Sequence, residues 1–210
     1  MLSVVIQAGG RSSRMGSDKA LVRLGGRALI EYALEAVAGL GDETIITTNH
    51  PEQLERFGIT LAQDLVPGAG ALHGLQTALT AAHGAHVLLA ACDMPFVQRP
   101  LLERLVELAP QADVVIPRPG GQYEPLLAVY DRRRCLAAVE AALAAGERRM
   151  ISFLPGLDVI ELDDAQLEPL DPQHLSFFNV NTAQDLQHAE RTLHSRPRAD
   201  YDSGHGGNPA

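Results

Sequence analysis

The sequence predicts an α/β fold with a mostly parallel sheet, on three observations. Strand-like and helix-like segments alternate over roughly the first 115 residues, as in chains whose parallel strands are joined by crossover helices. The run His86–Ala91 (HVLLAA) is almost entirely apolar, which is typical of a central strand buried on both faces. Hydrophobic residues make up 46% and charged residues 20% of the 210 residues. This is the composition of a globular protein.

Apolar and β-branched runs place the strands of the first half. The predicted strands are Leu2–Gln7, which ends at Ala8-Gly9-Gly10, then Glu43–Thr48, a weaker Ile59–Gln63, and His86–Ala91. Helical spacing starts near Ala28 and stops at Gly39 and Gly41. Pro51–Phe57 predicts a short helix capped by Asn49, and Leu75–Ala82 predicts another after the glycine-rich turn VPGAGALHG.

The second half continues with shorter strands and three helices. Pro100 suits the first turn of a helix that ends at Pro110. Asp131 caps a long alanine-rich helix closed by Gly146, and Thr182-Ala-Gln-Asp185 resembles a capping box at the start of the last helix. The predicted strands are Asp113–Ile116, Pro125–Tyr130 (which also suits an antiparallel orientation), Val159–Leu162 and Phe177–Val180. From Ser195 the chain has almost no apolar residues, so we expect one domain over 1–194 and a disordered tail over 195–210.

Composition excludes several classes of function. Lys and Arg total 17 against 26 Asp and Glu, a net charge of −9, so general binding to nucleic acid or to an anionic membrane is not expected. Cys92 and Cys135 lie far apart, which indicates neither a disulfide framework nor a structural zinc site. The start MLSVVIQAGG has no basic region, and no run reaches the length of a membrane span. We therefore expect a soluble, cytoplasmic protein.

The loop after the first strand is the strongest candidate for a phosphate site. Gly9 and Gly10 let backbone N–H groups approach an anion, and Arg11, Arg14 and Lys19 follow closely. These cations suit a triphosphate, although a basic solvated loop has the same composition. The glycine spacing fits neither a Walker A loop nor a dinucleotide-binding fingerprint.

Two carboxylates follow predicted strands at the edge where ligands bind in such sheets. Asp93 follows the most apolar strand, with Pro95 in the next turn, and could hold Mg²⁺ against phosphate oxygens. Asp64 could accept hydrogen bonds from a base or a ribose. A helix cap for Asp93 and a turn role for Asp64 remain open alternatives.

Several polar residues are weaker candidates. Arg148 and Arg149, in the Gly146-Glu-Arg-Arg cluster, could reach an acidic substrate or merely end a helix. Asn179 and Asn181 could contact a substrate phosphate or serve as turn and cap residues. The eight histidines are scattered without a metal-binding spacing.

Five motifs in this order resemble the molybdenum cofactor guanylyltransferases, the MobA family, over about residues 2–190. They are QAGGRSSRMGSDK ending at Lys19, GALHGL ending at Leu75, CDMPF ending at Phe96, GERR ending at Arg149, and FNVNTAQDL ending at Leu186. The first marks the wider nucleotidyltransferases, whereas CDMPF and FNVNTAQDL are more specific. Asp18 before Lys19, and Cys92 before Asp93, favour the guanylyl over the cytidylyl branch.

The resemblance implies a Rossmann-like three-layer sandwich that uses GTP and Mg²⁺. It implies transfer of GMP to molybdenum-loaded molybdopterin with release of pyrophosphate. In the family pattern the nucleotide contacts are Gln7, Ala8, Gly9, Lys19, Asp64 and Asp93, with the metal on Asp93; the catalytic set is then Lys19, Asp93 and Arg14. On the molybdopterin side the candidates are Asn179, Asn181, Arg148 and Arg149. Molybdenum-insertion proteins and molybdoenzyme chaperones are the protein partners that it suggests.

This chain departs from the family pattern at three positions. Gln7 stands where the family has Leu, Thr47 where it has a nucleotide-contacting Asn, and His73 where it has a small residue. These departures concern the shape of the nucleotide pocket. The alternative functions are a cytidylyltransferase or sugar-1-phosphate nucleotidyltransferase, and a non-catalytic GTP-binding regulator.

Overall fold

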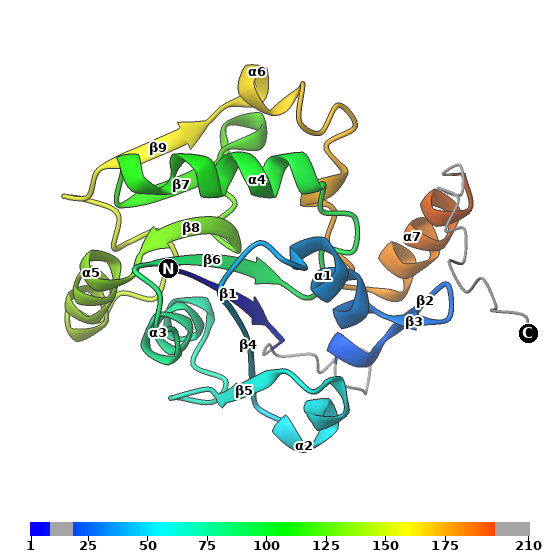
Figure 1. The fold of residues 1–210 in the computed structure, drawn as a ribbon, viewed down its shortest axis with the longest axis horizontal. Helices are drawn as coiled ribbons and strands as arrows, with labels where there is room; N and C mark the ends of the chain where they lie inside the picture. The colour runs from blue at the N-terminus through cyan, green and yellow to red at the C-terminus, as the bar shows by residue number, and fades with distance from the viewer. Residues whose placement is uncertain (9–18, 196–210) are drawn as a thin grey trace, which may run out of the picture.

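A seven-stranded sheet forms the centre of the residues that the structure describes, 1–8 and 19–195 of this computed structural model (Figure 1). The strand order is β5-β4-β1-β6-β8-β7-β9. Its strands are β1 (Leu2–Gln7), β4 (Glu43–Thr48), β5 (Thr60–Gln63), β6 (His86–Ala91), β7 (Val114–Pro117), β8 (Leu127–Asp131) and β9 (Val159–Leu162). Only β8 runs antiparallel to its neighbours, β6 and β7. The predicted mostly parallel α/β architecture is confirmed, as is the antiparallel orientation considered for the strand near residue 127.

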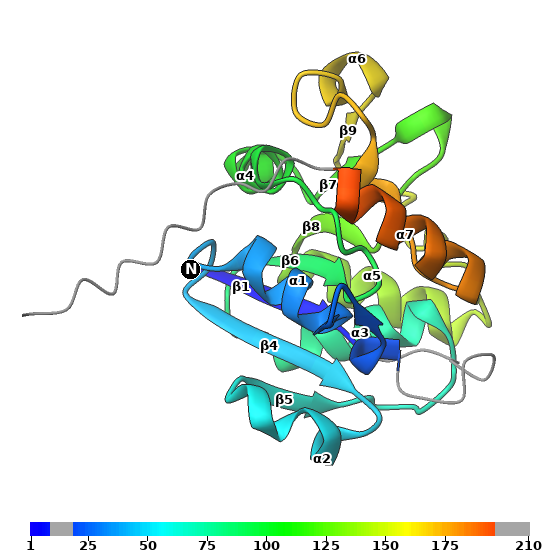
Figure 2. The same cartoon turned by 90° about the vertical axis from the view of Figure 1, so that its right-hand side faces the viewer.

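Helices cover both faces of this sheet and make three layers (Figures 1 and 2). Their bounds are α1 Leu29–Val37, α2 Pro51–Leu54, α3 Ala71–Ala81, α4 Arg99–Leu108, α5 Arg132–Ala144, α6 Asp164–Leu167 and α7 Ala183–Ser195. Side chains of β1 alternate between the faces: Val4 and Ile6 pack with α1 and α4, whereas Val5 packs with α3 and α5. No helix within the described ranges is both long and apolar enough to cross a bilayer.

Two of the predicted helix caps are present, at the starts of α5 and α7. The Asp131 carboxylate accepts a hydrogen bond from the Arg134 N–H, 2.8 Å away, at the start of α5. Before α7, the Thr182 hydroxyl accepts from the Asp185 N–H at 3.1 Å, while the Asp185 carboxylate accepts from the Thr182 N–H at 2.8 Å. This reciprocal pair is a capping box, with Asp in place of the usual Glu.

Three local predictions are wrong. Helix α3 begins at Ala71 rather than Leu75, so that Gly74 lies inside the helix. A glycine suits this position because an added Cβ would be 1.9 Å from Gln7 Nε2. Residues 177–180 form no strand. The side chains of Phe178 and Val180 pack in a small apolar cluster, and their backbone pairs with no strand of the sheet. Asn49 does not cap α2, because the N-cap residue is His50.

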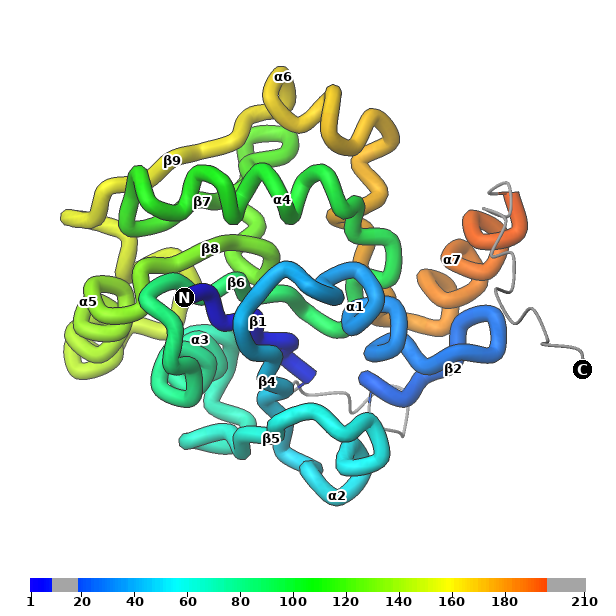
Figure 3. Tube along the Cα trace, in the orientation of Figure 1, coloured from blue at the N-terminus to red at the C-terminus, as the bar shows by residue number. Residues whose placement is uncertain are grey.

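A small apolar cluster lies beside the sheet and joins three distant segments. We call it the C-terminal cluster; its buried members are Val22, Leu24, Leu29, Phe96, Val180 and Ala189. It packs the hairpin formed by β2 (Arg23–Leu24) and β3 (Arg27–Ala28) against α7. The path of the chain in Figure 3 shows residues 175–195 returning to this hairpin. No part of this hairpin was predicted from the sequence.

Candidate active site

A cavity of about 660 Å³ opens at the carboxyl ends of β1 and β6. This is the edge at which ligands bind in open α/β sheets, and the volume suits a small-molecule ligand. The lining residues are Gln7, Ala8, Lys19, Asp64, Val66, Gly68, Ala69, Gly70, Ala71, Gly74, Ala91, Cys92, Asp93, Leu126, Arg148 and Asn181.

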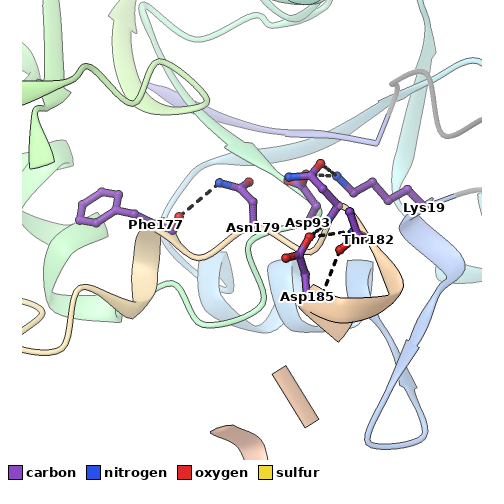
Figure 4. Close-up of polar contacts among 7 residues, drawn as sticks. Lys19, Asp93, Phe177, Asn179, Thr182 and Asp185 are labelled. Atoms are coloured by element: carbon purple, nitrogen blue, oxygen red, sulfur yellow. Dashed lines mark hydrogen bonds and ion pairs between the residues drawn. The ribbon is translucent and has the colours of Figure 1, made fainter. Parts of the chain in front are cut away.

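Lys19, Asp93 and Asn181 all line the cavity and contact one another there; Figure 4 shows the Lys19 side chain reaching Asp93. The Lys19 ammonium donates hydrogen bonds to Asp93 Oδ2 and to Asn181 Oδ1, the second at 2.6 Å. The side chains of Lys19 and Asp93 are only 19% and 14% exposed. One cation is therefore held between two oxygen ligands that come from distant parts of the chain.

The backbone explains how these three residues come together. Cys92 N–H donates to the Gln7 carbonyl at 3.1 Å, which continues the β1–β6 pairing up to the residue before Asp93. Val180 N–H donates to the Asp93 carbonyl at 2.9 Å. Asp185 also accepts from the Asn181 N–H at 2.9 Å. The site is thus built where the end of β6 meets the segment that leads into α7.

Asp93 has an oxygen suited to a divalent cation. Its Oδ1 is buried and has no hydrogen-bond partner, while Oδ2 contacts Lys19. Mg²⁺ is commonly held by one or two carboxylates together with substrate phosphates and water, so a single carboxylate with an unpaired oxygen fits it. The described residues contain no group of three or more His, Cys, Asp or Glu that could hold a metal by themselves.

Asp64 and Asn49 form a second polar pair in this region. Burial raises the pKa of Asp64, and a hydrogen bond from the Asn49 side chain partly offsets that effect. Oδ1 of each residue is buried without a partner. These two oxygens are acceptors that the protein leaves available to N–H or O–H donors of a ligand.

The three departures from the family pattern also carry buried polar atoms without partners. These atoms are Gln7 Oε1, Thr47 Oγ1 and His73 Nδ1. Gln7 and Thr47 are paired residues of β1 and β4, and Gly74 of α3 lies against the Gln7 amide. Gln7 therefore lines the cavity itself, Thr47 is its partner on the neighbouring strand, and His73 precedes the glycine that contacts it.

The structure gathers some predicted site residues and separates others. Gln7, Ala8, Lys19, Asp64, Asp93, Arg148 and Asn181 line the cavity. Arg149 and Asn179 do not; the Asn179 amide donates to the Phe177 carbonyl at 3.2 Å (Figure 4). Gly9 and Arg14 lie outside the described residues, as do Gly10 and Arg11.

Sequence reasoning gave no ligand role to two polar residues near the site. The strand-end rule includes Asn49, which follows strand β4, but its place before Pro51 pointed only to a helix cap. Glu124 follows no predicted strand, and no motif marks it. Burial raises the pKa of Glu124, and the nearby negative charge of Asp93 raises it further. Asp93 therefore has a second carboxyl group near enough to be affected by its charge.

Comparison with known proteins places this chain in a family. A model described as the MobA-like NTP transferase domain matches residues 4–160. The chain is similar to a probable molybdenum cofactor guanylyltransferase of Pelotomaculum thermopropionicum, with 38% identity covering 87% of this chain and 88% of the relative. It is 32% identical to the molybdenum cofactor guanylyltransferase of Desulfosudis oleivorans, covering 90% and 94%.

A solved structure agrees with these sequence matches. The crystal structure of molybdopterin-guanine dinucleotide biosynthesis protein A from Archaeoglobus fulgidus is similar with a TM-score of 0.79 and 32% identity, covering 92% of this chain and all of that one. The chain therefore belongs to the MobA-like NTP transferases and, within them, to the molybdenum cofactor guanylyltransferases.

Proposed function

We propose that this chain transfers GMP from GTP to molybdenum-loaded molybdopterin. The observation that carries the site assignment is the meeting of Lys19, Asp93 and Asn181 at the carboxyl end of β6. In the reaction an oxygen of the molybdopterin phosphate forms a bond to the α-phosphorus of GTP. The bond from that phosphorus to the bridging oxygen breaks, and pyrophosphate leaves with the electron pair. No protein nucleophile is required, since the substrate phosphate attacks.

The side chains position the reactants and balance charge. Lys19 takes up negative charge that builds on the departing pyrophosphate. Arg14, outside the described residues, would be a second cation for the same charge. Asp93 would hold Mg²⁺ through its unpaired Oδ1, and the metal, when bound, neutralises phosphate oxygens and makes the phosphorus more electrophilic.

The guanosine would lie near Asp64, which also lines the cavity. Asp64 and its partner Asn49 would accept hydrogen bonds from the nucleoside. Ala8 N–H already donates to the Thr47 carbonyl at 2.8 Å, so Ala8 would contact the nucleotide through its other atoms. Gln7 would line the same space, and Gly9 would contribute backbone from outside the described residues.

Arg148 and Asn181 are the candidates for the molybdopterin side. Both line the cavity, and Asn181 touches the lysine that we assign to the phosphates. Arg149 and Asn179 would need to move to reach it. The cytoplasmic location and the protein partners, molybdenum-insertion proteins and molybdoenzyme chaperones, stay predictions from the sequence.

The test is product formation from molybdenum-loaded molybdopterin, Mg²⁺ and either GTP or CTP, followed by mass spectrometry. We expect a guanine dinucleotide with GTP and no product with CTP. A cytosine product would move the chain to the cytidylyl branch. GTP binding without any product would instead favour a non-catalytic regulator.

A further inference from the structure

The backbone at Lys19 is tied to the β2–β3 hairpin. Lys19 starts a short 3₁₀ helix, Lys19–Leu21, that leads directly into β2. Val22 N–H donates to the Lys19 carbonyl at 3.2 Å, and the Val22 carbonyl accepts from Leu29 N–H at 2.9 Å. The position of the hairpin therefore determines from where the lysine side chain reaches toward Asp93.

The tip of this hairpin rests on the last helix. Gly25 N–H donates to Glu190 Oε1 at 2.9 Å. Gly25 has a φ of +56°, and an added Cβ would lie 2.4 Å from Leu193 Cδ2, so the glycine permits a backbone conformation and a close approach that a side chain would prevent. In Figure 1, α7 lies beside β2 and β3. Glu190 and Leu193 together set the register between hairpin and helix.

The other end of α7 leads to the second ligand of Lys19. Asp185, in the first turn of the helix, accepts hydrogen bonds from the N–H groups of Asn181 and Thr182. Between the two ends, the C-terminal cluster buries Val22, Phe96 and Val180, each within three residues of Lys19, Asp93 and Asn181 respectively. One 13-residue helix thus contacts both the segment that carries the cation and the segment that carries its ligand.

We propose that Glu190 is a positioning residue for Lys19: by holding the hairpin on α7, it sets the ammonium at the distance from Asp93 and Asn181 that phosphate binding requires. This inference rests on the proposed function, in which Lys19 binds the triphosphate. A carboxylate that accepts a backbone N–H is a strong, directional contact. Its loss would let the hairpin tip move while the sheet keeps its own core.

The test is a double-mutant cycle on nucleotide affinity, measured by isothermal titration calorimetry with GTP and GMP. We expect Glu190→Ala to weaken GTP binding about five- to tenfold, up to ~1.4 kcal/mol, and to leave GMP binding unchanged because GMP lacks the leaving phosphates. Glu190→Gln keeps an oxygen acceptor and should bind GTP within about twofold of wild type. Gln187→Ala, an exposed change on the same helix, is the matched control.

The Lys19→Ala background separates positioning from general stability. If Glu190 acts through Lys19, Glu190→Ala costs no GTP affinity once Lys19 is gone. A loss that persists in that background, an equal loss with Glu190→Gln, or no loss at all would each overturn the proposal. If Glu190→Ala does not fold, Glu190→Asp, which withdraws the carboxylate by one methylene, takes its place in the cycle with the same expected pattern.

The same data distinguish this inference from the proposed function. Wild-type protein that fails to bind GTP, or that binds it as well after Lys19→Ala, would contradict the proposed nucleotide site and this inference with it. Wild-type GTP binding that depends on Lys19 but not on Glu190 would overturn only the positioning role.

Discussion

Gly74→Ala tests whether Gln7 and the first turns of α3 compete for one space. The added Cβ would lie 1.9 Å from Gln7 Nε2 and 3.0 Å from Cδ, inside the 3.4 Å at which ordinary van der Waals contact begins. The amide must therefore rotate, at a cost of about 0.5–1.5 kcal/mol if it leaves its preferred rotamer. Alanine in a helix interior stabilises the folded protein by about 1 kcal/mol relative to glycine. The two effects nearly cancel, so we expect the free energy of unfolding to stay within about 1 kcal/mol of wild type.

The cancellation disappears when Gln7 is shortened. The Gln7→Ala background removes the three atoms nearest to the new methyl group, and Gly74→Ala should then stabilise the protein by about 1 kcal/mol. Urea unfolding of the four proteins gives the coupling energy directly, and we expect about 1 kcal/mol. An identical effect of Gly74→Ala in both backgrounds would refute the steric reasoning. A large loss of stability when Gly74→Ala is added to the Gln7→Ala protein would refute it as well.

Three further predictions concern charged groups. Asp93→Asn should lower pyrophosphate release at least tenfold with little change in Tm; unchanged turnover would remove Asp93 from the metal site. Lys19→Ala frees Asp93 Oδ2, so nucleotide-free protein should bind Mn²⁺ severalfold more tightly in an EPR titration, and equal or weaker binding would contradict competition between lysine and metal. Burial would raise the pKa of Glu43, but hydrogen bonds from Ser3 and His83 prevail and lower it to about 2. Because this pKa is depressed, the stabilisation is present above pH ~4.5 and is lost as pH falls toward 2, roughly 1–3 kcal/mol. Ser3→Ala should reduce that acid dependence in unfolding experiments, and an unaltered pH profile would argue against it.

The segments predicted well are those whose local pattern and tertiary environment agree. His86–Ala91 is apolar because both faces of β6 are covered, and the strand has the predicted bounds. Leu2–Gln7, Glu43–Thr48 and Val159–Leu162 also match. The rule that ligands bind beyond the strand ends predicts Asp64 and Asp93 at one edge of the sheet. Both residues line the same cavity.

The failures have tertiary causes. Glycine at residue 74 looks like a turn signal, but it serves a close contact inside a helix. The apolar run at 177–180 packs into the C-terminal cluster, and apolar spacing over four residues does not separate packing from sheet pairing. The contact between Lys19 and Asn181 spans 162 positions, beyond the reach of any periodicity. Gly9 and Arg14 lie outside the described residues, so the roles predicted for them stay predictions.

That long span has a consequence for how the protein is made. The neighbouring strands β4, β1 and β6 are all complete by residue 91, so much of the sheet can form while the ribosome is still adding the rest, as domains commonly do during synthesis. Lys19 is then already present and Asp93 follows directly after β6, but Asn181 and the helix that contacts the hairpin are among the last segments to emerge. A nascent or prematurely ended chain can therefore have much of its sheet folded while the contact between Lys19 and Asn181 is still missing. Catalytic competence would be acquired at the end of translation rather than gradually along it.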